Sequence, residues 1–120
     1  MTSPIDKAFI LGVQASQDGF DWRDPVLAMA KVQEEFQELL EALQNNDSDA
    51  TKDELGDLLF SVVQVARLAK VDASQALEQA NEKFIRRYEG MKKLSENQAF
   101  ATLSLDQQMQ LWQRVKQDRT

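Results

Sequence analysis

Residues 24–68 read DPVLAMAKVQEEFQELLEALQNNDSDATKDELGDLLFSVVQVARL. Apolar side chains recur in this stretch every three or four residues, which is the spacing of one face of an α-helix. Asp24 followed by Pro25 is a helix cap followed by a favoured first helical residue, and the polar run NNDSD interrupts the pattern. We therefore predict two helices, over residues 25–44 and about 48–70, that pack antiparallel because their connection is short.

The sequence on either side continues the helical pattern. Ser3 with Pro4 starts another helix, and Asp72 and Ser104, each followed three residues later by glutamine, resemble the caps of two more. The chain has only 4 glycines and 2 prolines, so few breaks are expected. These signals predict an all-α fold, an antiparallel bundle of about five helices in a single domain over residues 1–120.

Each of the two central helices has an apolar stripe, which we expect to face the core. In the first helix the stripe consists of Val32, Phe36, Leu39 and Leu43. In the second helix it consists of Leu55, Leu58, Leu59, Val62 and Ala66. If the two stripes pack together, the polar residues that flank them meet across the seam.

The composition excludes several classes of function. The formal net charge of −6 opposes binding to nucleic-acid backbones or anionic membranes. Because the chain has neither cysteine nor histidine, disulfides, thiolate or imidazole metal sites and histidine general bases are excluded. No apolar run approaches the roughly 18 residues of a membrane span, and the first residues do not resemble an export signal. We expect a cytoplasmic protein with no nucleic-acid or membrane partner.

Acidic residues are concentrated on the two central helices, where residues 31–57 contain nine acids and two lysines. Glu35 and Glu38 are three residues apart beside one stripe, and Glu54 and Asp57 have the same spacing beside the other. Four carboxylates brought together would repel one another unless a cation compensated them. An all-oxygen site of this kind suits Mg²⁺, or Mn²⁺ as a substitute. Gly56, between two of the acids, is costly inside a helix and indicates a close approach of some kind.

Other interpretations of these residues stay open. Glutamate-rich helix faces are ordinary solvent-exposed surfaces, often paired with lysine as Lys31 and Glu35 could be. Gly56 could serve the packing of a neighbouring helix. A helical dimerisation or regulatory protein would use the same stripes and bind no nucleotide, and a metal-dependent hydrolase could act on another phosphate ester.

The order of the acidic motifs resembles that of a known family. EEFQE at 34–38 and ELGD at 54–57 are similar to the EExxE and ExxD signature of the all-α nucleoside triphosphate pyrophosphohydrolases, which include MazG and the dimeric dUTPases. The MazG branch is the closer match. Five stretches of this chain resemble sequence motifs of that branch: GFDWRD at 19–24, KVQEEFQEL at 31–39, DELGDLLFSVVQVARL at 53–68, ANEKFIRRY at 80–88 and SLDQQMQLW at 104–112.

The resemblance implies a single-domain, MazG-like enzyme that hydrolyses a nucleoside triphosphate to the monophosphate and pyrophosphate. It implies a metal role for Glu35, Glu38, Glu54 and Asp57, with Mg²⁺ as the cofactor. It also implies assembly as a dimer or a dimer of dimers, hence a homodimer or homotetramer, with active sites at helix interfaces. Nucleotide-pool cleansing is the physiological role that we expect.

The reaction needs a carboxylate that orients or deprotonates the attacking water, and we assign this catalytic role to Glu38 or Glu34. Substrate binding is assigned to residues of three stretches. These residues are Lys31, Asn81, Lys83, Arg86, Phe20 and Trp22. The basic side chains would bind phosphates and the aromatic ones would contact the base. The alternatives are salt bridges with the acidic helices and aromatic side chains that only pin the loop to the core.

Overall fold

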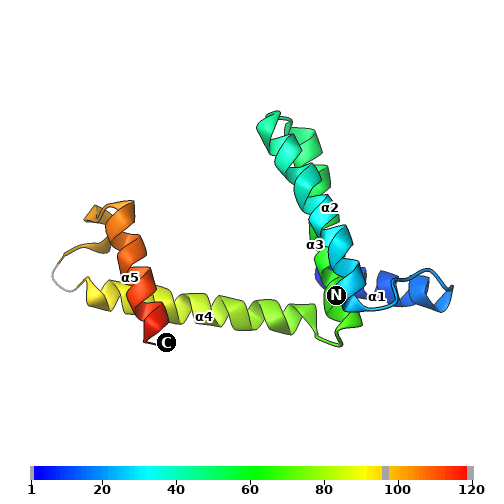
Figure 1. Ribbon diagram of the computed structural model, residues 1–120. Coiled ribbons are helices and arrows are strands. Elements are labelled where there is room, and N and C mark those ends of the chain that lie inside the picture. Colours follow the sequence, from blue (N-terminus) through cyan, green and yellow to red (C-terminus); the bar gives the residue numbers. More distant parts are fainter. Residues whose placement is uncertain (1, 96–97, 119–120) are drawn as a thin grey trace. The chain divides into compact units, whose positions relative to one another are not determined.

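The computed structural model describes residues 2–95 and 98–118 of the chain, and all of its regular structure is helical (Figure 1). No strand occurs within these described residues, which confirms the predicted all-α fold. The helices are α1 (Pro4–Gln17), α2 (Pro25–Gln44), α3 (Ser48–Leu68), α4 (Ala73–Leu94), the short 3₁₀ helix η1 (Phe100–Thr102) and α5 (Leu105–Gln117). The sequence predicted the five α-helices but not η1.

The helix starts follow the caps that the sequence indicates. The side chain of Ser3 accepts a hydrogen bond from the Asp6 backbone N–H, and that of Asp24 accepts one from Leu27. Ser104 begins α5 with a complete capping box. Each cap satisfies a backbone donor that the first turn of a helix leaves without a partner, so these helices begin where the sequence predicts.

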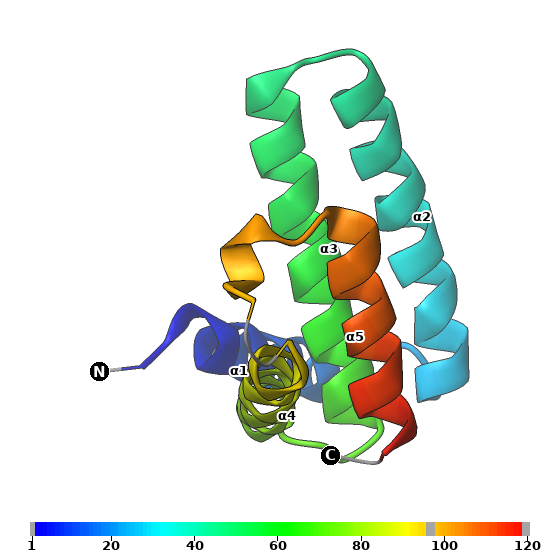
Figure 2. The ribbon, with the colours of Figure 1, turned by 90° about the vertical axis from the view of Figure 1, so that its left-hand side faces the viewer.

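The chain divides into two compact units, Met1–Ala76 and Leu77–Thr120. In the first unit α2 and α3 lie side by side and antiparallel, and α1 packs against α3 (Figure 2). Helix α4 begins in the first unit and continues into the second. A single domain over residues 1–120 stays a prediction.

The buried faces of α2 and α3 differ from the predicted ones. Small or polar side chains are buried on these helices: Ala28, Glu35 and Ala42 on α2, and Ser61, Val63 and Gln64 on α3. Several large apolar side chains of the predicted stripes are exposed instead: Phe36, Leu43, Leu55, Leu59 and Val62. The prediction that these side chains face the core within the chain is therefore wrong, because small and polar residues of the two helices are buried in their place.

The second unit is held together by aromatic side chains of α4, η1 and α5. The ring of Phe84 lies 5.7 Å from that of Trp112, and Tyr88 meets Phe100 edge-on at 5.6 Å. Val115 is buried and would lie 3.3 Å from a Cβ atom added at Gly90. These contacts give Trp112 a packing role within this unit. In the part of the chain that the structure covers, no helix has the length and apolar character needed to cross a membrane.

Candidate metal centre

Three carboxylates from two helices meet across the seam between α2 and α3. Glu35 and Glu38 of α2 and Glu54 of α3 each offer an oxygen within 4.8 Å of the others. Their positions follow from helix geometry, because residues three apart share a face and α2 and α3 are antiparallel neighbours. We call this group the carboxylate cluster. It contains three of the four side chains that the sequence predicts as metal ligands.

The fourth predicted ligand belongs to an adjoining group. Asp57 lies with Asp53 and Glu54 in a second set whose oxygens are all within 4.8 Å of one another. Glu54 is common to both sets, so the two groups are continuous along α3. Asp53 was not among the ligands predicted from the sequence. Its signal was its spacing of four residues from Asp57, which places both on one face of the helix.

The carboxylate cluster contains buried oxygens that lack a partner. Glu35 is only 4% exposed, and its Oε1 lies 3.0 Å from Nζ of Lys31. Oε2 of Glu35 and Oε2 of Glu54 are buried and have no hydrogen-bond partner among the described residues. A buried charged oxygen without a partner is costly, so such oxygens indicate that a cation or another donor is needed.

The neighbouring carboxylates alter the protonation of Glu54. The pKa of the Glu54 carboxyl is raised from its usual 4.5 to about 7. The largest cause is a hydrogen bond with Glu38, followed by burial and by the negative charges of Glu38, Glu35 and Asp53. Sharing a proton lets two carboxylates occupy one site, and a divalent cation would compensate the same charge by displacing that proton.

The donor set fits a hard divalent cation. It consists only of carboxylate oxygens from adjacent helices, the ligand type that Mg²⁺ and Mn²⁺ prefer. The unpartnered oxygens of Glu35 and Glu54 supply the positions where such an ion would bind. Gly56 has open space around it, because a Cβ atom added there meets nothing within 4 Å in the described chain. Helix packing within the chain therefore does not account for this glycine.

Two further predicted residues of α2 lie beside the cluster. Nζ of Lys31 contacts Glu34 at 3.6 Å as well as Glu35, and the hydrogen bond with Glu35 is the main cause that raises the pKa of Lys31. Glu34 is exposed and belongs to neither carboxylate group found in the residues described. Of the two carboxylates predicted to orient water, the structure brings only Glu38 into the cluster.

The remaining predicted substrate ligands belong to the loop between α1 and α2 and to α4. Phe20 and Trp22 are in the loop between α1 and α2, where Phe20 is 82% exposed and Trp22 is partly buried. Asn81, Lys83 and Arg86 are exposed residues of α4 in the second unit. Their roles in substrate binding stay predictions.

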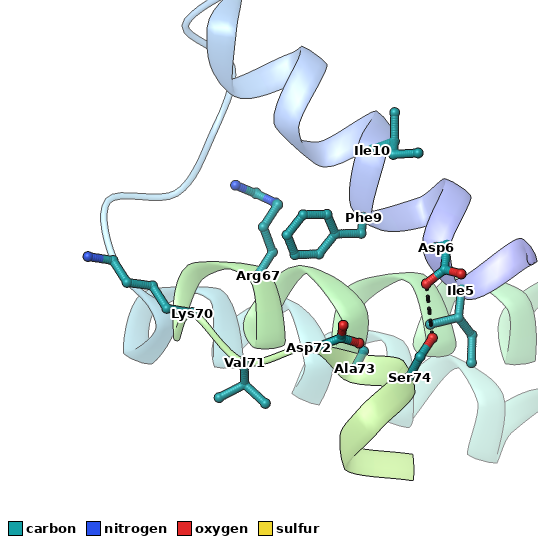
Figure 3. A pocket seen from close by; sticks show the side chains of 10 residues that line it. All are labelled: Ile5, Asp6, Phe9, Ile10, Arg67, Lys70, Val71, Asp72, Ala73 and Ser74. Carbon is teal, nitrogen blue, oxygen red and sulfur yellow. Dashed lines mark hydrogen bonds between the residues drawn. The ribbon is translucent and has the colours of Figure 1, made fainter. Parts of the chain in front are cut away.

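The first unit also contains a cavity of about 440 Å³ between α1 and the connection from α3 to α4 (Figure 3). Phe9 and Arg67 are among its lining residues, and at its edge Ser74 donates a hydrogen bond of 3.0 Å to Asp6. None of the predicted site residues lines this cavity. The candidate site is therefore defined by the carboxylates and not by this cavity.

An all-helical unit with an oxygen-only acidic cluster between antiparallel helices defines a class, the helical proteins with a carboxylate group suited to a hard divalent cation. The sequence model of the MazG nucleotide pyrophosphohydrolase domain matches residues 23–91, which include every residue of the carboxylate cluster. The chain belongs to this MazG family.

Two proteins with similar sequences are named as nucleoside triphosphate pyrophosphohydrolases. The chain is 38% identical over 104 residues to the nucleoside triphosphate pyrophosphohydrolase/pyrophosphatase MazG of Thermotoga maritima, covering 85% of this chain and 40% of the relative. It is 34% identical over 102 residues to the nucleoside triphosphate pyrophosphohydrolase of Escherichia coli K12, covering 82% of this chain and 39% of the relative. The chain thus spans about 40% of the length of these relatives.

Proposed function

We propose that this protein hydrolyses nucleoside triphosphates, ribo or deoxy, to the monophosphate and pyrophosphate in the presence of Mg²⁺. The observation that carries this proposal is the carboxylate cluster with its two buried, unpartnered oxygens. Membership of the MazG family and the activity for which the relatives are named support the substrate class. In this proposal the protein acts in the cytoplasm and removes unwanted nucleotides from the pool.

In the proposed reaction, Glu35, Glu38, Glu54 and Asp57 hold the cation. When bound, Mg²⁺ would offset charge on the phosphates and acidify water. Glu38 is favoured over Glu34 as the residue that orients the attacking water and accepts its proton, because Glu38 is part of the cluster. The water oxygen forms a bond to the α-phosphorus while the bond from this phosphorus to the bridging oxygen breaks. Pyrophosphate leaves with the electron pair.

We propose that polar and basic side chains of α4 take part in binding the substrate. Lys83 and Arg86, with Asn81 nearby, would bind the β- and γ-phosphates and stabilise the charge that develops on pyrophosphate. Lys31 is already paired with Glu35, so we propose that it helps to fix this ligand and reaches the substrate from there.

We also propose that the protein acts as a homodimer or homotetramer. The described chain buries few apolar side chains, and most of these are small: Ala8, Ala28, Ala42, Val63, Met91 and Val115. Large apolar side chains on α2 and α3, including Phe36, Leu43 and Leu59, are each more than half exposed. A second copy that covers this face would bury them and bring further residues to the site.

A non-catalytic helical dimerisation protein is the second candidate, and the same exposed apolar side chains favour it. It does not account for buried carboxylates whose oxygens lack partners, which are unfavourable unless they bind something. Binding of nucleotide and dependence on Mg²⁺ separate the two candidates.

The test is to incubate the protein with a panel of ribo- and deoxynucleoside triphosphates, with and without Mg²⁺, and to identify both products. We expect monophosphate and pyrophosphate, formed only with the cation. The activity should fall by about 100-fold or more in Glu38→Gln, because removal of a general base typically costs 10²–10⁴-fold. Glu41→Gln, which removes an exposed acid of the same helix outside the cluster, is the matched control. Orthophosphate and diphosphate as products would contradict the proposal.

A further inference from the structure

A buried polar network connects α1, α3 and the loop between α1 and α2. Gln64 of α3 is 1% exposed, and its Nε2 donates a hydrogen bond of 2.8 Å to the backbone oxygen of Ala8 in α1. Its Oε1 accepts a hydrogen bond of 2.8 Å from Nε of Arg67. Both ends of a fully buried amide are thus satisfied, which fixes the orientation of Gln64 and holds the Arg67 side chain in one position.

Arg67 in turn holds the loop. Its Nη2 donates to Oδ1 of Asp21 at 2.7 Å and its Nη1 donates to Oδ2 at 3.0 Å, so the guanidinium binds the carboxylate with two parallel hydrogen bonds. The side chains are 9% and 16% exposed. This hydrogen bonding is the main cause that holds the pKa of Asp21 below its ordinary value. A two-bond pair of this kind specifies geometry as well as supplying energy.

Asp21 also holds the backbone of the residue that follows it. Its Oδ1 also accepts a hydrogen bond of 2.9 Å from the backbone N–H of Trp22. The Phe20 backbone N–H donates to Ala15 at 2.9 Å. The loop backbone is therefore fixed on both sides of Asp21, while the Phe20 side chain projects with 82% of its surface exposed.

Gly12 of α1 makes room for the network. A Cβ atom at this position would lie 1.9 Å from Oε1 of Gln64 and 2.5 Å from Nε of Arg67. These separations are far shorter than a carbon contact allows, so only glycine lets the amide and the guanidinium pass across α1. Three elements are thus adapted to one ion pair at an exposed loop.

We propose that Arg67 is a positioning residue for the substrate: held by Gln64 across Gly12, it fixes the loop through Asp21 so that Phe20 and Trp22 contact the nucleoside end of the nucleotide. Arg67 follows Glu54 by thirteen residues on α3, about 20 Å along the helix axis, so it acts through the loop and not at the cluster. The inference rests on the proposed function, because it takes a nucleotide as the substrate.

The test measures the loop and the reaction separately. In a Trp112→Phe background, Trp22 is the sole tryptophan, and acrylamide quenching of its fluorescence reports the accessibility of the loop. We compare Arg67→Gln with Asp21→Asn, which removes the charge of the loop partner and should leave the Arg67 contact with Gln64 in place. Arg23→Gln, which removes an exposed arginine of the same loop, is the matched control.

We expect both network variants to raise the quenching constant. KM for the best nucleoside triphosphate should rise by roughly tenfold, the equivalent of losing about 1.4 kcal/mol of binding. kcat should stay within about twofold, because the lost contact is made equally in the ground and transition states. Arg23→Gln should change none of the three quantities.

Quenching that is unchanged in both network variants would overturn the inference, whatever their activity. Increased quenching with an unchanged KM would overturn the role in substrate binding while hydrolysis itself stands. If the parent protein hydrolyses no nucleoside triphosphate, the proposed function fails and the substrate role of the loop falls with it. The quenching result then decides alone whether Arg67 holds the loop.

Discussion

Glu54 is the residue that the two carboxylate groups of the candidate site share. It belongs to both carboxylate groups, one of its oxygens is buried without a partner in the described structure, and its pKa is raised to about 7. The sequence predicted that Glu35, Glu38 and Glu54 meet if the two central helices pack along their apolar stripes, because residues three apart share a helix face. It did not predict Asp53, because membership of that group depends on which side-chain oxygens approach and not on the three-residue motif.

The raised pKa of Glu54 predicts how stability depends on pH in the absence of a divalent cation. The unfolded chain ionises Glu54 near 4.5 and the folded chain near 7, so the folded state binds more protons between these values. The contribution of Glu54 to the free energy of unfolding is therefore fully present below about pH 4.5 and is lost as pH rises through about 7.

Thermal unfolding between pH 4 and 8, in buffer with a chelator, measures this effect. The decrease in Tm over this range should be smaller in Glu54→Gln, which cannot ionise, than in the unaltered protein. Excess Mg²⁺ should also reduce the decrease, because the cation replaces the proton. Identical pH profiles for the two proteins would show that Glu54 is not perturbed in this way.

At the scale of the elements, the sequence pattern predicted the helices correctly. It did not predict which faces of α2 and α3 are buried. Caps such as Ser3, Asp24 and Ser104 and the three-to-four-residue period predicted where helices start, because these signals are local. The buried faces of α2 and α3 were not predicted, since small residues such as Ala28 and Ala42 are buried while larger apolar residues of the stripes are exposed. An apolar stripe indicates that a helix face is favourably buried. It does not indicate whether another helix of the same chain or a second chain buries it.

Two of the three helical glycines, Gly12 and Gly56, are expected to respond oppositely to alanine. Around Gly56 the described chain leaves open space, so Gly56→Ala should raise the free energy of unfolding by about 0.5–1 kcal/mol through helix propensity. Urea denaturation measures the change. A loss of stability in Gly56→Ala would show that another surface packs there in the assembled protein.

Gly12→Ala is the counterpart on α1. Because the added carbon collides with Gln64 and Arg67, the free energy of unfolding should fall by about 1–3 kcal/mol. The same urea titration gives the value. A change of less than about 0.5 kcal/mol, which is typical of an ordinary surface substitution, would mean that the buried amide moves aside without cost.

For the whole molecule, the exposed apolar surface of α2 and α3 bears on assembly. Leu43 is 53% exposed on α2 and Leu59 is 58% exposed on α3. Leu43→Glu should shift the protein toward the monomer, because a charge buried at an interface without a partner is unfavourable. Light scattering coupled to size-exclusion chromatography measures the mass. Leu105→Glu, at a position 71% exposed on α5, is the control and should leave the mass unchanged.

If Leu43→Glu keeps the mass of the unaltered protein, this part of α2 is not an interface. A monomeric mass for the unaltered protein would contradict the proposed homodimer or homotetramer directly.

Binding of a divalent cation to the carboxylate cluster is the central claim, and Mn²⁺ titration followed by electron paramagnetic resonance tests it most directly. The signal of free Mn²⁺ should be reduced by the protein and restored by excess Mg²⁺. The reduction should be largely lost in Glu54→Gln and in Glu38→Gln, and kept in Glu41→Gln. Equal binding by all four proteins, or no binding at millimolar Mn²⁺, would contradict a metal centre formed by these residues.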